Sequence, residues 1–115
     1  MAFQEVAREA DVPPGQTRFL NVEGKPLVLA RWEGRIYALS GLCPHQWKPL
    51  AGATIWDGLL TCPWHNFQYD LRTGENRYPS NVYPAGAEYL REQVAPLKTY
   101  PVEIRGGAVW VDLSG

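Results

Sequence analysis

The chain has 115 residues, of which 45% are hydrophobic and 20% charged, a composition typical of a folded domain rather than a disordered chain. Its net charge of −1, from 11 basic and 12 acidic residues, argues against a nucleic-acid binder, which usually has a strongly basic face. The length predicts one domain, residues 1–115, with room for one modest hydrophobic core but not two.

The sequence contains no candidate membrane span and no evident secretion signal. A transmembrane helix needs roughly 20 consecutive apolar residues, and no stretch of this chain comes near that length. Charges are scattered through the first residues, which have no apolar run of the kind found in signal peptides. We therefore expect a cytoplasmic protein with no membrane partner. In that reducing compartment, Cys43 and Cys62 are better read as metal ligands or buried thiols than as a disulfide.

Short strands are predicted along most of the chain. With 11 glycines and 10 prolines spread through it, the sequence leaves little room for long helices. Glu33-Gly34 and Gly106-Gly107 each join two apolar runs and are typical of tight hairpins. This rhythm predicts an all-β fold, an antiparallel sandwich or small barrel. The strand-like runs are residues 3–6, 17–22, 26–32, 35–39, 59–62, 67–71, 100–105 and 108–113.

One segment, residues 75–97, does not follow this pattern. It contains three prolines, which interrupt the strand rhythm, and its residues 87–94 could form two helical turns. The segment could act as a partner-specific lid or form a simple surface excursion. Elsewhere, Trp32, Trp56 and Trp110 lie in or near strand-like runs, and we expect them in the core.

The two cysteines and two histidines of the chain fall in two short clusters. The first reads Cys43-Pro44-His45 and the second Cys62-Pro63-Trp64-His65, which gives the pattern C-x-H-x16-C-x-x-H. A proline follows each cysteine, and proline cannot donate to a sheet ladder, so both clusters are expected in loops rather than within strands. Each loop thus offers one thiolate and one imidazole as candidate metal ligands.

This donor set suits a [2Fe–2S] cluster that binds its two irons unequally. Such a cluster needs four ligands, and thiolates hold iron at low potential. Neutral imidazoles on one iron remove negative charge there and raise the potential. Zinc also accepts two cysteines and two histidines, so a structural zinc site is the main alternative. Zinc modules usually pair ligands of one type within each knuckle, whereas each half of this pattern mixes the two types.

The pattern C-P-H-x16-C-P-W-H resembles the cluster-binding signature of the Rieske family over residues 40–72. The resemblance implies an antiparallel β-sandwich that carries a two-loop cluster-binding subdomain at about residues 41–72. It also implies one [2Fe–2S] cluster, with Cys43 and Cys62 on one iron and His45 and His65 on the other.

The sequence is most similar to bacterial Rieske-type ferredoxins that serve aromatic-ring oxygenases, and to the small Rieske subunit of assimilatory nitrite reductases. The resemblance implies a non-catalytic electron carrier, whose partners would be a flavoprotein reductase and a terminal oxygenase. The alternative is a small Rieske subunit bound to the large subunit of a nitrite reductase. A zinc-stabilised binding module without a redox role is the alternative from another class.

Two residues near the second cluster are expected to influence the reduction potential. High-potential relatives place a serine, which donates to a bridging sulfide, where this chain has Phe67. A tyrosine two positions later is matched by Tyr69, whose hydroxyl could reach a ligand sulfur. Hydrogen bonds to sulfur stabilise the reduced cluster, so we expect a low-to-intermediate potential for a centre of this type.

Overall fold

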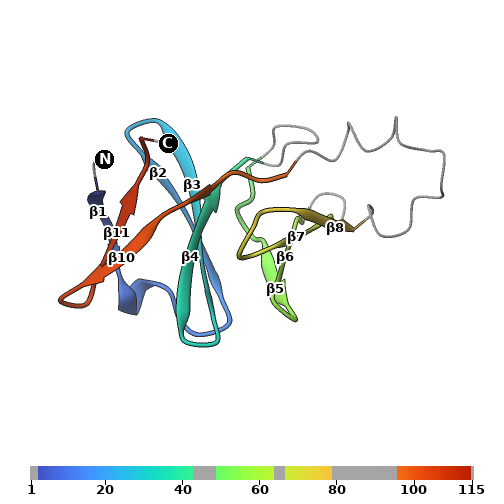
Figure 1. Ribbon diagram of the computed structural model, residues 1–115, viewed down its shortest axis with the longest axis horizontal. Coiled ribbons are helices and arrows are strands. Elements are labelled where there is room, and N and C mark those ends of the chain that lie inside the picture. The colour runs from blue at the N-terminus through green and yellow to red at the C-terminus, as the bar shows by residue number, and fades with distance from the viewer. Residues whose placement is uncertain (1–2, 43–48, 64–66, 79–95, 115) are drawn as a thin grey trace.

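The computed structural model describes residues 3–42, 49–63, 67–78 and 96–114. Within these residues the regular elements are β-strands and one short 3₁₀ turn, Glu9–Asp11, which confirms the all-β prediction. The strands form three antiparallel sheets, and Figure 1 shows them side by side along the long axis of the molecule. No helix among the described residues is long and apolar enough to cross a membrane.

The middle sheet is the structural centre of the molecule. It contains β2 (Thr17–Val22), β3 (Lys25–Trp32), β4 (Arg35–Ser40) and β9 (Thr99–Tyr100), in the order β2-β3-β4-β9. Side chains alternate between the two faces of a strand, and in β3 both faces are buried. This double burial explains why residues 27–30 read as an uninterrupted apolar run instead of an alternating one.

Two buried clusters lie on opposite faces of this sheet, so the expectation of a single core was wrong. Leu27 and Leu29 of β3 belong to one cluster, whereas Val28 and Ala30 belong to the other. A chain of this size can bury two clusters because β3 contributes side chains to both, one cluster on each of its faces. The first cluster packs against the outer sheet and the second against the sheet that carries the predicted metal loops.

The outer sheet is formed by the two ends of the chain. It contains β1 (Phe3–Arg8), β11 (Ala108–Asp112) and β10 (Val102–Arg105), in the order β1-β11-β10. The hairpin at Gly106-Gly107 is confirmed, as is the one at Glu33-Gly34 between β3 and β4. The single strand predicted over residues 100–105 is instead two strands, because the chain leaves β4 at Pro101 and joins β11.

The third sheet consists of four three-residue strands: β5 (Thr54–Trp56), β6 (Leu59–Thr61), β7 (Gln68–Asp70) and β8 (Asn76–Tyr78). The sequence analysis missed β5 and β8. The prediction that residues 75–97 interrupt the strand rhythm was therefore wrong at the start of the segment, where β8 pairs with β7. The predicted helical turns at 87–94 lie outside the described residues.

The three strand tryptophans do not share one environment. Trp32 packs against the core as expected. Trp110 is half-buried, and the guanidinium of Arg105 lies 4.7 Å from the centre of its ring. Trp56 is 64% exposed, so its assignment to the core was wrong. Its strand is short and ends in the tight turn at Asp57, where the side chain meets solvent rather than a neighbouring sheet.

Candidate metal centre

The first donor cluster lies in the connection between β4 and β5. Cys43 and His45 fall outside the described residues, but the base of their loop is described. Leu42 and Pro49 form an antiparallel bridge, and the Leu50 N–H donates to the Gly41 carbonyl at 2.7 Å. The chain therefore leaves and re-enters the fold at one point, with the predicted ligands of this loop between the two ends.

A glycine seats this loop base against the middle sheet. The Gly41 N–H donates to the Pro26 carbonyl at 3.0 Å. A Cβ atom added to Gly41 would lie 2.6 Å from the backbone nitrogen of Leu27, closer than real Cβ contacts come. Any other residue at this position would push the loop base away from β3.

The second donor cluster begins directly after β6. Cys62 is completely buried, and its N–H donates to the Phe67 carbonyl at 2.8 Å. Pro63 is exposed in the turn that follows, which confirms its predicted place in a loop. His65 lies outside the described residues, as do Pro44, Trp47, Lys48 and Trp64. Like the first loop, this one is closed at its base by a backbone hydrogen bond.

The two loop bases rest on one apolar cluster. Leu50, from the first base, and Cys62, from the second, belong to the same group of buried residues as Leu60 and Tyr69. The half-buried ring of Phe67 packs against this group. The structure thus brings together the bases of two loops that are distant in sequence, and it anchors both on the face of the middle sheet formed by residues such as Val28.

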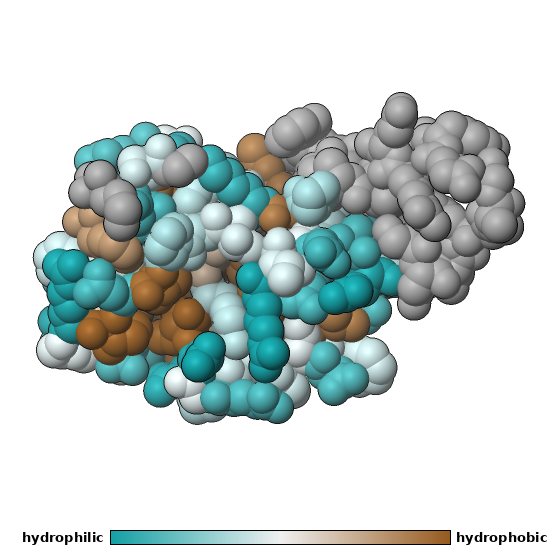
Figure 2. Space-filling view, in the orientation of Figure 1, coloured by the Kyte–Doolittle hydropathy of each residue, from teal (hydrophilic) through white to brown (hydrophobic). Residues whose placement is uncertain are grey.

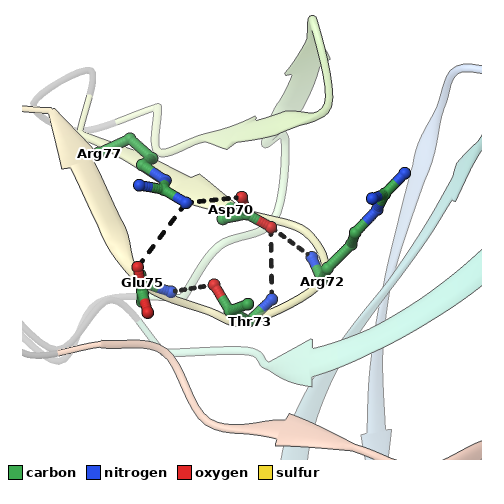
Figure 3. A network of polar contacts seen from close by, with 5 residues as sticks. All are labelled: Asp70, Arg72, Thr73, Glu75 and Arg77. Atoms are coloured by element: carbon green, nitrogen blue, oxygen red, sulfur yellow. Dashed lines mark hydrogen bonds and ion pairs between the residues drawn. The ribbon is translucent and has the colours of Figure 1, made fainter.

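The turn after β7 is fixed by a polar network around Asp70 (Figure 3). One carboxylate oxygen of Asp70 accepts hydrogen bonds from the backbone N–H groups of Arg72, at 2.8 Å, and Thr73, at 3.3 Å. The other accepts one from the Arg77 guanidinium at 3.2 Å, and Arg77 also pairs with Glu75 at 3.7 Å. Burial alone would raise the pKa of Asp70, but these hydrogen bonds favour the charged form and leave its pKa below the ordinary value.

This turn also holds the segment that returns to β9. The Leu97 N–H donates to the Gly74 carbonyl at 2.8 Å, and the Leu97 side chain is buried in the cluster beneath the loop bases. Gly74 has a φ of +78°, and a Cβ atom there would lie 1.9 Å from the Leu97 carbonyl oxygen. The network and this contact were not predicted from the sequence. The Asp70-Leu-Arg-Thr-Gly74 run carries only a general turn signal.

The described donor of the predicted set, Cys62, suits an iron–sulfur cluster, for which cysteine thiolates are the usual ligands. Cys62 provides a thiol from a dry, apolar position at the base of a closed loop. Within the described residues, no three side chains of His, Cys, Asp or Glu converge on a common point. Cys62 is the one described member of the predicted ligand set; the other three, Cys43, His45 and His65, lie in segments 43–48 and 64–66, outside the described residues.

A scan against protein families matches the Rieske [2Fe-2S] domain over residues 2–101. The ferredoxin component of the naphthalene 1,2-dioxygenase system of Pseudomonas aeruginosa is 33% identical over 108 residues, covering 90% of this chain and 88% of that protein. The ferredoxin component of the alkene monooxygenase system of Xanthobacter autotrophicus is 28% identical over 110 residues, covering 95% of this chain and 80% of that protein.

Solved structures agree with this assignment. The ferredoxin of carbazole 1,9a-dioxygenase from Nocardioides aromaticivorans has the same fold, with a TM-score of 0.75 at 24% identity, over 96% of this chain and 97% of that one. A structure of the reduced oxygenase with the oxidised ferredoxin of carbazole 1,9a-dioxygenase gives a TM-score of 0.74 at 25% identity, over 95% of this chain and 91% of the matched chain. The chain therefore belongs to the Rieske [2Fe-2S] family, with one [2Fe-2S] cluster as its cofactor.

Proposed function

We propose that this protein carries single electrons from a flavin-dependent reductase to a terminal oxygenase. Its cluster would be held by Cys43 and Cys62 on one iron and by His45 and His65 on the other. The observation that supports this most directly is that the bases of both loops are closed by backbone bonds and rest on one group of buried apolar residues. Cys62 lies at the base of the second loop. We also propose that the protein works in the cytoplasm and that residues 1–115 act as one domain.

The residues around the loops have two tasks in this function. Buried Cys62, with Leu50, Leu60 and Tyr69 around it, keeps water away from the thiolate side of the site. The backbone bonds at both bases fix where each loop leaves and re-enters the fold. When bound, the cluster supplies a one-electron redox couple whose potential depends on its thiolate and imidazole ligands and on hydrogen bonds to its sulfurs.

Relatives support an oxygenase as the electron acceptor. Those compared above are ferredoxin components of a naphthalene dioxygenase and an alkene monooxygenase system. A matched solved structure contains a ferredoxin together with its oxygenase. A flavoprotein reductase is the donor that we propose on the earlier resemblance. The nitrite reductase subunit stays an alternative prediction, with a large permanent partner as its distinguishing feature.

The cofactor and its ligands are tested on protein purified without oxygen. We expect a coloured protein with two irons and two sulfides per chain, as a [2Fe–2S] cluster requires. Electron paramagnetic resonance of the dithionite-reduced protein should give the low average g value of mixed cysteine and histidine ligation. A folded, colourless protein that contains zinc would contradict the proposal and favour the zinc module.

The carrier role is tested by stopped-flow spectroscopy. The protein is mixed with the NADH-dependent flavoprotein reductase and the terminal oxygenase of the same organism, and its visible spectrum is followed. We expect rapid reduction by the first and reoxidation by the second, with substrate turnover that depends on this protein. Stable co-purification with a large nitrite reductase subunit, and no electron transfer to the oxygenase, would favour the alternative.

Tyr69 provides a finer test of how the fold adjusts the potential. It is completely buried in β7, opposite Leu60 of β6. If its hydroxyl donates to a ligand sulfur, Tyr69→Phe should lower the reduction potential, because the reduced cluster loses a stabilising hydrogen bond. Protein-film voltammetry measures the change, and Tyr37→Phe on β4 is the control. An unchanged potential in Tyr69→Phe would contradict this role.

A further inference from the structure

A groove separates the outer sheet from the middle sheet, away from both loop bases. It has a volume of about 670 Å³ and lies between β4 and β10, with Leu71 and Arg72 at one side. In Figure 1, β4 and β10 diverge from the place where β9 meets β4. None of the described residues of the two loop bases, such as Gly41, Leu50 and Cys62, lines the groove. It is therefore distinct from the proposed electron-transfer site.

Both walls of the groove are open strand edges. β9 pairs with β4 only at Ala38 and Leu39, after which Pro101 takes the chain to β11. Hydrogen-bonding direction alternates along an antiparallel strand, and the Ser40 N–H points to the Lys98 carbonyl. By the same alternation, the N–H and C=O of Ile36 face the groove, beyond the end of β9.

The same reasoning applies to β10. The Pro101 carbonyl accepts a hydrogen bond from the Asp112 N–H, so residues of odd number face β11. The backbone groups of Val102 and Ile104 therefore point away from the sheet, along the edge of a strand with no second neighbour among the described residues. An open edge of this kind can accept an additional strand from another chain.

The groove has apolar residues on both walls, next to polar and charged ones. Ile36, Tyr100, Val102 and Ile104 line it, and Ile104 is 45% exposed. Figure 2 shows hydrophobic side chains gathered on this part of the face, where β4 and β10 diverge. A strand added to the open edge of β10 would cover Ile104 together with the unpaired backbone groups beside it.

The free charges at the groove are positive. Arg35 and Arg72 line it, and within the described residues neither guanidinium makes a hydrogen bond or an ion pair. Figure 3 shows the Arg72 side chain pointing away from the network around Asp70. The one carboxylate lining the groove, Glu9, is already 4.0 Å from the Arg31 guanidinium. An occupant with carboxylates would satisfy both free arginines.

We propose that this groove binds an extended segment of a partner protein in which acidic residues alternate with apolar ones. The segment adds a strand to the open edge of β10, its apolar side chains pack on Ile36 and Ile104, and its carboxylates pair with Arg35 and Arg72. Alternation suits a strand, since successive side chains point to opposite sides. The groove thus gives the carrier a second attachment surface besides its cluster loops.

The proposal is tested with a labelled peptide and the cluster-containing protein. The probe is an eight-residue peptide of alternating glutamate and valine with blocked ends and a fluorescein label, and binding is measured by fluorescence anisotropy. We expect saturable binding that weakens as salt increases, because exposed charges are screened. The matched peptide of alternating lysine and valine should not bind. Equal binding of the two peptides, or none by the acidic one, overturns the proposal.

Variants separate charge from strand pairing. The double variant Arg35→Glu and Arg72→Glu should bind at least about tenfold more weakly, because two favourable charge pairs become repulsive. The control Arg18→Glu makes the same kind of charge change on the exposed side of β2 and should bind within about twofold of the parent. Unchanged binding by the double variant overturns the proposal even if the peptide binds the parent.

Ile104→Pro tests the strand edge itself. It removes an N–H that faces the groove while leaving the bonds from β10 to β11 in place, and proline is tolerated at such edge positions. We expect peptide binding to weaken about tenfold with an unchanged visible spectrum. If analytical ultracentrifugation shows that the parent protein is a dimer and that Ile104→Pro is a monomer, the groove is occupied by a second copy of this chain. That result overturns the proposal. None of these readouts depends on electron transfer, so they are independent of the proposed function.

Discussion

The two ends of the molecule differ in the length of their strands. The middle and outer sheets contain strands of up to eight residues, with buried side chains on both faces of β3. The sheet that carries the metal loops has four strands of three residues each. Leu60 of this sheet, with Leu50 and Leu71 from the adjoining loop and turn, packs in one cluster with Val28, Ala30 and Leu39 of the middle sheet. The two large sheets thus share one buried cluster, and the small sheet shares the other with the middle sheet.

This difference suggests that the two large sheets form the scaffold and that the small sheet serves mainly to position the metal loops. Short strands make few ladder bonds, and an isolated hairpin is at best marginally stable in water. We infer that the β5–β8 sheet gains the rest of its stability from its contacts with the middle sheet and from ligands that join its two loops. The following experiments test that comparison, beginning with the largest expected effect.

Cys62→Ser should abolish cluster binding, because a serine hydroxyl is a poor substitute for a buried thiolate ligand. Visible absorption and iron content measure the loss. We expect faster hydrogen exchange in β5–β8 than in the parent, and little change in β3 and β11. The control is Trp56→Ala, an exposed position in the same sheet, which should keep its colour. If exchange in β5–β8 is unaffected in colourless protein, the small sheet is stable without its ligands.

Leucine truncation on the two faces of the middle sheet should have unequal consequences. Leu29→Ala, in the cluster shared with the outer sheet, should lower the free energy of unfolding by about 3 kcal/mol. Leu60→Ala, beneath the loops, should cause loss of visible colour at a lower denaturant concentration than loss of circular dichroism. Coincident transitions by both probes in the two variants would show that the regions unfold as one unit.

Gly74→Ala should destabilise the link between the small sheet and β9. The added methyl group would meet the Leu97 carbonyl at 1.9 Å and would also require alanine at a φ of +78°, for which we expect about 3 kcal/mol. Gly52→Ala is the matched control, with a φ of +85° and no atom within 4 Å of the added methyl. It should cost only about 1 kcal/mol, the strain of the backbone alone. Thermal denaturation compares them, and equal losses would contradict the steric argument.

Asp70→Asn should have the smallest effect, about 1 kcal/mol at neutral pH. The pKa of Asp70 is lowered in the folded state, so its carboxylate stabilises the fold above the ordinary pKa, near 4. That stabilisation declines once the unfolded chain begins to take up a proton at this position, and it is lost as the pH falls through the lowered pKa, below which both states are protonated. The difference between parent and variant should shrink as acid is added, measured by urea unfolding from pH 7 downward. A difference that grows in acid would contradict this sign.

Much of the scaffold could be predicted from local signals. Strands β3 and β4 follow from continuous apolar runs, and the Glu33-Gly34 turn between them is typical of a hairpin. The same signal at Asp57-Gly58 could have revealed β5, but a three-residue strand offers too few positions to display a period. The exposure of Trp56 could not be predicted, since β-propensity does not say which face of a strand meets solvent.

The site divides in the same way between sequence and structure. Ligand chemistry is local, so two cysteines and two histidines in a fixed order indicated the cofactor before any fold was known. Two other features depend on residues far apart in the chain: both loop bases rest on one group of buried apolar residues, and the Leu97 N–H donates to the Gly74 carbonyl. No local pattern encodes such contacts.

What the sequence by itself determined is thus the family, the all-β class and the residues that we propose as ligands, because each depends on short-range spacing. Only the tertiary structure decided that β3 supplies two cores, that Pro101 transfers the chain between sheets, and that an open groove lies between β4 and β10. The physical reason is that burial and strand pairing join distant residues, and which edges stay unpaired is known only once every strand has its neighbours.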